Sequence, residues 1–117
     1  MPDRPEDLTL RECVPCRGGV PALEGPELAA LMRRLDDRWR LVEEHHLERE
    51  YAFDNYSAAV DFTNAVARLA QKQDHHPELR LTYDKVTVMV WTHKAGGLTF
   101  NDFVFAAKTE KLFQEHA

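Results

Sequence analysis

The sequence has little of what marks a membrane or secreted protein. No apolar run approaches the roughly 20 residues that a bilayer-spanning helix needs. The first part of the chain also lacks the apolar segment of a secretory signal, because charged side chains recur through it. They are Asp3, Arg4, Glu6, Asp7, Arg11 and Glu12. We therefore expect a cytoplasmic protein that does not contact a membrane.

Positive charge is also scarce. The chain has 15 Lys and Arg against 20 Asp and Glu, for a formal net charge of −5. A protein that binds nucleic acid phosphates regardless of base sequence needs the opposite balance. The expected partner is therefore a small molecule or another protein, and nucleic acid is not expected.

Cysteine occurs only as Cys13 and Cys16, in a lone Cys-Val-Pro-Cys. A structural zinc site generally takes four ligands, and no second pair with suitable spacing follows. A redox motif would normally open a helix after a strand, which the following Arg17-Gly18-Gly19 does not indicate. We expect two reduced thiols in an N-terminal arm, with no metal and no cofactor.

The 117 residues suffice for one domain of ordinary size. Residues 1–23 contain four of the six prolines and two of the five glycines, without a helical or alternating pattern. This composition predicts an irregular arm. Residues 24–117 are expected to form the single domain, and any second site would come from oligomerisation.

The domain alternates helical and strand patterns. From Pro26, apolar residues three and four apart predict a helix that ends near Asp36-Asp37. Period-two patterns then predict two strands joined by a polar turn at residues 43–46. A helix capped by Asp54 or Asn55 should follow.

A second hairpin and a last helix complete the pattern. Val86, Val88 and Val90 alternate with other residues, so they should form the buried face of a strand. Thr99 and Asp102 have the spacing of a capping box that opens the last helix. The order α-β-β-α-β-β-α predicts an α+β fold, a four-stranded antiparallel sheet with helices packed on one face.

Two histidines stand side by side where the middle helix should end. Pro77 disfavours helical geometry at His76 and has no N–H of its own, so the helix should stop near His75. Because imidazole exchanges protons near neutral pH, the pair is a candidate acid/base site, with a solvated loop as the alternative. Another pair, His45 and His46, is expected to decorate the polar turn.

Two further proton-handling groups come from later in the chain. Continuing the period of two, His93 falls on the Trp91 face at the end of the last strand. Asp102 enters at the first turn of the last helix, where its capping role is a sufficient structural explanation. Each group alone is weak evidence of catalysis.

Together these positions resemble the pterin-4a-carbinolamine dehydratases, known in animals also as dimerisation cofactors of a homeodomain transcription factor. The resemblance covers about the last ninety residues and includes the Trp39 strand. Its motifs are Asp74-His75-His76-Pro77-Glu78, Tyr83, Thr92-His93, Gly96-Gly97-Leu98-Thr99 and Asp102. Pro15-Cys16-Arg17-Gly18-Gly19 is similar to the arm of many bacterial members.

The resemblance implies a reaction and its residues. The family eliminates water from a 4a-hydroxytetrahydropterin to give the quinonoid dihydropterin, which recycles the cofactor of aromatic amino-acid hydroxylases. Carried over, His75 and His93 are the catalytic acid/base pair, and Asp102 tunes or orients a histidine. His76 would bind the pterin, beside Pro77 and Glu78. A homodimer or homotetramer is implied, with a hydroxylase as a further partner.

One residue departs from the family pattern. Gln71 stands where the family commonly has an acidic residue, and glutamine can hydrogen-bond but carries no charge, so we expect an activity that is weaker or shifted in pH. A function of a different class is the alternative. Relatives with this fold also serve as protein-binding adaptors or assembly chaperones, for which an exposed sheet face or the apolar last helix would suffice. We would expect such members to lose the histidines, and His75, His76 and His93 are all present here.

Overall fold

The computed structural model describes residues 8–10 and 21–116. Cys13, Cys16 and most of the predicted arm lie outside these residues. The elements are η1 (Leu8–Leu10), α1 (Gly25–Met32), β1 (Arg40–Val42), β2 (His46–Ala52), α2 (Tyr56–Gln73), β3 (Glu78–Leu81), β4 (Lys85–Val90), η2 (His93–Ala95) and α3 (Phe100–His116), where η marks a 3-10 helix.

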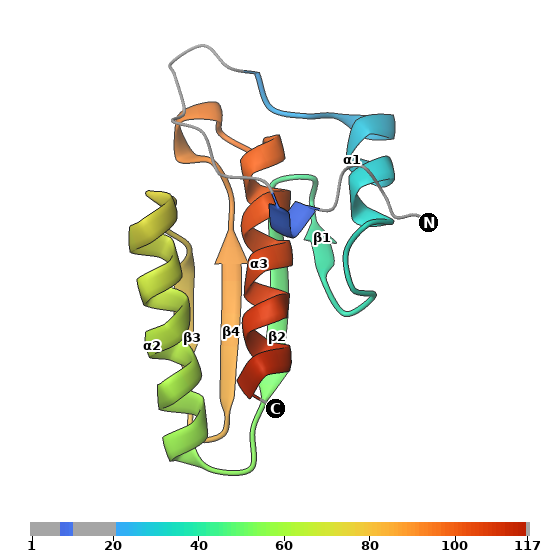
Figure 1. Cartoon of the computed structure of the whole chain (residues 1–117). Helices are drawn as coiled ribbons and strands as arrows, with labels where there is room; N and C mark the ends of the chain where they lie inside the picture. The colour runs from blue at the N-terminus through green and yellow to red at the C-terminus, as the bar shows by residue number, and fades with distance from the viewer. Residues whose placement is uncertain (1–7, 11–20, 117) are drawn as a thin grey trace.

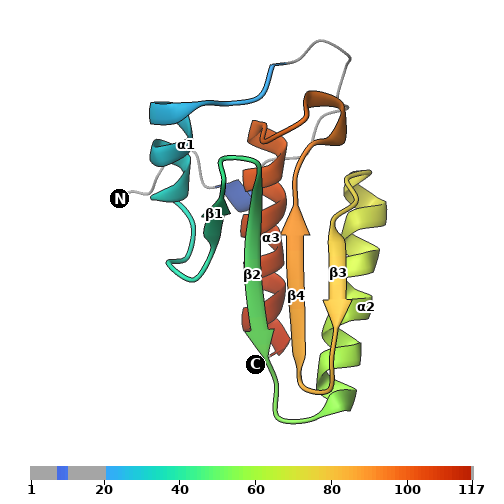
Figure 2. The same ribbon diagram turned by 180° about the vertical axis from the view of Figure 1, so that it is seen from behind.

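The four strands form one antiparallel sheet in the order β1-β2-β4-β3. Helices α2 and α3 lie side by side on one face of this sheet (Figures 1 and 2), while α1 lies beyond its β1 edge. The other face is uncovered in the described part of the chain. The predicted α+β fold is confirmed.

The inner face of the sheet carries the core. Val86, Val88 and Val90 of β4 are fully buried beneath the helices, as their alternation predicts. Opposite Val86 and Val90, strand β2 places Tyr51 and Leu47, which are also fully buried. Full burial of a valine or leucine stabilises the fold by about 1.5–3 kcal/mol. The two central strands therefore fix the sheet against α2 and α3.

Helix α2 begins as predicted, with Asn55 Oδ1 accepting from the backbone N–H of Ala58 at 2.8 Å. Its end is set by Asp74, which adopts the left-handed conformation (φ 53°, ψ 44°). The N–H of His75 then donates to the carbonyl of Ala70 at 3.1 Å. This left-handed cap, three residues before Pro77, stops the helix and fixes where His75 begins.

Three predicted boundaries were wrong. Helix α1 ends at Met32, because the N–H groups of Arg34 and Leu35 bond three residues back and tighten the chain into turns. His46 is the first residue of β2, since residues 43–45 form the hairpin turn before it, with positive φ at Glu43 and Glu44. Strand β4 stops at Val90, which leaves His93 to open η2.

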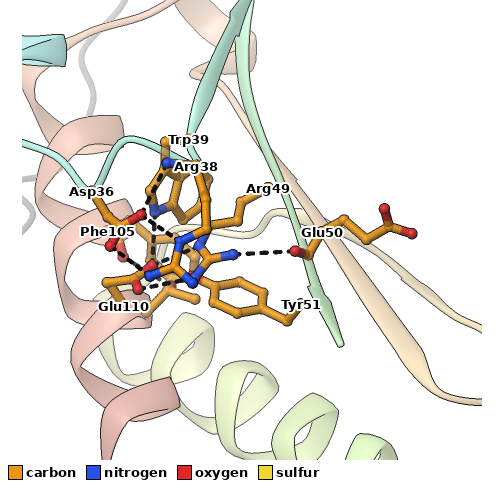
Figure 3. A network of polar contacts seen from close by, with 9 residues as sticks. Asp36, Arg38, Trp39, Arg49, Glu50, Tyr51, Phe105 and Glu110 are labelled. Carbon is orange, nitrogen blue, oxygen red and sulfur yellow. Dashed lines mark hydrogen bonds and ion pairs between the residues drawn. The ribbon is translucent and has the colours of Figure 1, made fainter. Parts of the chain in front are cut away.

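A buried ion pair joins α3 to β2 (Figure 3). Arg49 is 3% exposed, and its guanidinium donates to both carboxylate oxygens of Glu110, at 2.8 and 3.0 Å. Glu110 Oε1 also accepts from the hydroxyl of Tyr51 at 2.9 Å and from the indole N–H of Trp39 at 3.2 Å. This network compensates for burying two charges on the inner face of the sheet.

We expect this network to make the fold sensitive to high pH. Burial, followed by the nearby Glu110 charge, raises the pKa of Tyr51 well above its usual range. An unfolded tyrosine loses its proton at a pKa near 10. The folded phenol stays neutral at this pH. Its contribution to stability is therefore complete below about pH 10. Above about pH 10, the free energy of unfolding falls by about 1.4 kcal/mol per pH unit. Urea unfolding at pH 7 to 11.5 measures this slope.

The control for this prediction is a pair of Tyr→Phe variants. Tyr51→Phe removes the buried phenol, so its unfolding free energy should fall less steeply above pH 10. Tyr56→Phe changes a side chain that is 51% exposed and should keep the wild-type slope. Equal slopes for wild type and Tyr51→Phe would contradict the prediction.

Candidate active site

Three segments meet at one end of the molecule. The end of α2, the η2 turn and the start of α3 lie together there (Figures 1 and 2). They carry His75, His93 and Asp102 respectively. An isolated bridge between Thr92 and Gly97 closes the η2 turn. The fold thus brings the three predicted catalytic residues to a shared region.

The most direct contact in this region joins His75 to Asp102. His75 Nε2 lies 2.6 Å from Asp102 Oδ1, and the two residues are 27 positions apart in sequence. The His75 side chain is 11% exposed and the Asp102 side chain is fully buried. The His75 ring also packs near Phe105, with ring centroids 5.9 Å apart. The buried Asp102 carboxylate therefore contacts one nitrogen of the partly accessible His75 imidazole.

The second oxygen of Asp102 is bound from two sides. Asp102 Oδ2 accepts from the backbone N–H of Thr99 at 2.8 Å. This is the contact that the predicted capping box assigns to its acidic residue. It also accepts from the hydroxyl of Thr92 at 2.8 Å. The Thr99 hydroxyl, expected to cap the helix, instead lies 2.8 Å from the Thr92 hydroxyl. Asp102 is thus both a cap and the centre of a buried polar cluster.

His93 differs from His75 in its surroundings. It is exposed at the start of η2, and its ring lies over Trp91 with centroids 4.5 Å apart. The same indole contacts the rings of His45 and His46, at 5.2 and 5.8 Å. His45 and His46 therefore pack on the same indole as His93. His93 is open to solvent, as a group that meets a substrate must be.

Comparison with known proteins identifies the family. A model of the family described as pterin 4 alpha carbinolamine dehydratase matches residues 21–112. The chain belongs to this family. The match spans α2, the second hairpin and most of α3, and so includes the site. The resemblance inferred from the sequence motifs is confirmed.

Relatives agree with this assignment. A protein from Rubrobacter xylanophilus is 49% identical over 106 residues, which cover 91% of this chain and 98% of the relative. One from Alkaliphilus metalliredigens is 41% identical over 109 residues, with 93% and 98% covered. Both carry the name pterin-4-alpha-carbinolamine dehydratase provisionally.

Solved structures share the fold. The crystal structure of a transcriptional coactivator/pterin dehydratase from Brucella melitensis matches with a TM-score of 0.72 at 33% identity, over 77% of this chain and 96% of that one. A pterin dehydratase-like protein described as a RuBisCO assembly factor matches with a TM-score of 0.55 at 22% identity, over 63% and 87%. The second match supports the fold alone.

The predicted pterin-binding residues of this dehydratase-family chain follow directly after His75. His76 is exposed, Pro77 is half-buried, and Glu78 is exposed as the first residue of β3. Gln71 is exposed on the last turns of α2. His76 and Glu78 are therefore open to solvent at the same end of the molecule as His93.

Among residues 8–10 and 21–116, His, Cys, Asp and Glu form no group of three or more suited to a metal ion. No helix in that part of the chain is long and apolar enough to cross a bilayer.

The sequence motifs include Thr92 but assign it no role, although a signal for one is present. Thr92 continues the period-two series of Val86, Val88 and Val90 onto the buried face, where it is 3% exposed. A hydroxyl at a buried position needs a hydrogen-bond partner. The partner is Asp102, ten residues later, which the period of the strand does not reveal.

Proposed function

We propose that the protein dehydrates 4a-hydroxytetrahydropterins to quinonoid dihydropterins. An acid protonates the 4a-hydroxyl, the C4a–O bond breaks and water leaves. A base takes a ring-nitrogen proton, and the electron pair left behind forms the new double bond to C4a. One proton enters and one departs, so no oxidant, reductant or metal is needed.

His75 and His93 are the proposed acid/base pair. Both tasks suit imidazoles, which are available in neutral and protonated forms near pH 7. The observation that carries this proposal is the contact of His75 Nε2 with the fully buried Asp102, which leaves Nδ1 as the nitrogen available to a substrate. His93 would act from η2, and His76, Pro77 and Glu78 would bind and orient the pterin.

An absorbance assay tests the proposal. Freshly generated 4a-hydroxytetrahydropterin is followed as it breaks down, with and without micromolar protein. We expect the protein to accelerate the loss of water. No acceleration by folded protein would favour the alternative function, a non-catalytic adaptor or assembly chaperone.

The adaptor alternative would use the uncovered face of the sheet. A cavity of about 530 Å³ on the chain is lined by charged and polar side chains and by none of the predicted site residues. Its lining consists of Arg38, Arg40, Glu48, Arg49, Glu50, Arg80 and Thr87.

A homodimer or homotetramer is proposed for either function, and a hydroxylase that supplies the pterin is a proposed partner for the dehydratase.

A further inference from the structure

The two oxygens of Asp102 are used differently, and this difference points to a role for Thr92. Oδ2 accepts two hydrogen bonds, from the Thr99 backbone N–H and the Thr92 hydroxyl. Among the contacts described, the one partner of Oδ1 is Nε2 of His75. Thr92 thus supplies one of the two hydrogen bonds to Oδ2, and Oδ1 faces the imidazole of His75.

The directions of these hydrogen bonds follow from the chemistry of the groups. A backbone N–H only donates, and the single hydroxyl proton of Thr92 goes to Asp102. The Thr92 oxygen must therefore accept from the Thr99 hydroxyl at 2.8 Å. An ionised carboxylate can only accept hydrogen bonds, so the expected donor at Oδ1 is the Nε2–H of His75.

We propose that Thr92 is a positioning residue that acts through Asp102 on His75. Its hydroxyl fixes the rotation of the buried carboxylate, so that Oδ1 holds the Nε2–H tautomer of neutral His75. Nδ1 is then unprotonated and free to exchange a proton with the substrate. This inference rests on the proposed dehydration for its catalytic meaning, but the tautomer can be measured without any substrate.

The test uses histidine 15N NMR at a pH where His75 is neutral, with its signals assigned by their loss in His75→Gln. Protonated and unprotonated ring nitrogens differ widely in chemical shift. In the wild type we expect Nε2 of His75 to be protonated and Nδ1 to be unprotonated. An unprotonated Nε2 would mean that Asp102 carries the shared proton, and would overturn the proposal.

Substitutions at Thr92 provide the second arm. Thr92→Val removes the hydroxyl, and we expect a mixture of His75 tautomers together with a loss in kcat of about tenfold to a hundredfold, as when the outer partner of a metal-bound histidine is removed. KM should change little, because Thr92 is buried, with 3% of its surface exposed. Thr92→Ser keeps the hydroxyl and should restore both the tautomer and kcat.

A matched control separates positioning from general packing. Thr109 is fully buried and its hydroxyl donates to the carbonyl of Phe105 at 2.8 Å, two helical turns beyond Asp102. Thr109→Val loses a comparable hydrogen bond but should leave the His75 tautomer and kcat unchanged. If Thr92→Val does not fold, Thr99→Val removes the hydroxyl behind Thr92 and should shift the tautomer in the same direction, less strongly.

The outcomes distinguish this inference from the proposed function. A His75 tautomer that follows Thr92 in a protein without dehydratase activity would support the positioning role and contradict the proposed reaction. Dehydratase activity with a tautomer indifferent to Thr92→Val would support the reaction and overturn the positioning role.

Discussion

His75→Ala and His93→Ala should each slow pterin dehydration by about tenfold to a thousandfold, the range that general acid–base groups contribute. Each variant removes an imidazole from the proposed pair. His75→Ala also leaves Asp102 Oδ1 buried without its partner, which costs about 1–3 kcal/mol of stability. The measurement is kcat from the absorbance assay, with the urea midpoint determined in parallel.

His75→Gln separates chemistry from stability. A glutamine amide can donate to Asp102 as His75 does, but it does not exchange protons near pH 7. We expect His75→Gln to be as inactive as His75→Ala and closer to the wild type in stability. Lys72→Ala, an exposed change one turn upstream, should keep full activity. Wild-type rates from folded His75→Ala would remove His75 from the mechanism.

Glu110→Ala should be the most destabilising single change discussed, costing about 3–5 kcal/mol. This change leaves the guanidinium of Arg49, a residue that is 3% exposed, buried without a counter-charge. It also removes the acceptor for Tyr51 and for Trp39, which are seen around the same carboxylate in Figure 3. Because small domains have only about 5–15 kcal/mol of stability, the midpoint of urea unfolding should fall sharply.

Two comparisons sharpen the Glu110 result. Lys111→Ala changes the exposed neighbour and should alter stability by no more than about 0.5 kcal/mol. Arg49→Met combined with Glu110→Gln removes both charges while keeping an acceptor, so it should unfold at higher urea than Glu110→Ala. A cost below about 1 kcal/mol for Glu110→Ala would show that the buried pair contributes little.

Local patterns were sufficient to predict the sheet and the helix starts. Burial at Val86, Val88 and Val90 follows from the period of the strand, and Asn55 caps α2 because its side chain reaches a backbone N–H three residues on. The contact of Asp102 with the Thr99 N–H is equally local. Such features depend on spacing, which the sequence contains.

Features that depend on distant partners could not be predicted in the same way. A charge at Arg49, between two buried positions of β2, implies a partner, but Glu110 lies 61 residues away. The left-handed cap at Asp74 lacks the glycine that would predict it, and the start of the 3-10 turn at His93 lacks a side-chain cap hydrogen bond. The family resemblance brought His75, His93 and Asp102 together before any geometry did.

Because Asp102 lies on α3, its contact with His75 can form only after α3 has been made. His75 precedes the β3–β4 hairpin in the chain and Asp102 follows it, so their contact must close a loop that contains the whole hairpin. During synthesis the histidine is made first and lacks its carboxylate until α3 has left the ribosome and docked on the sheet. A nascent or misfolded chain with only α2 and the hairpin therefore lacks the contact between His75 and Asp102 on which the proposed reaction depends.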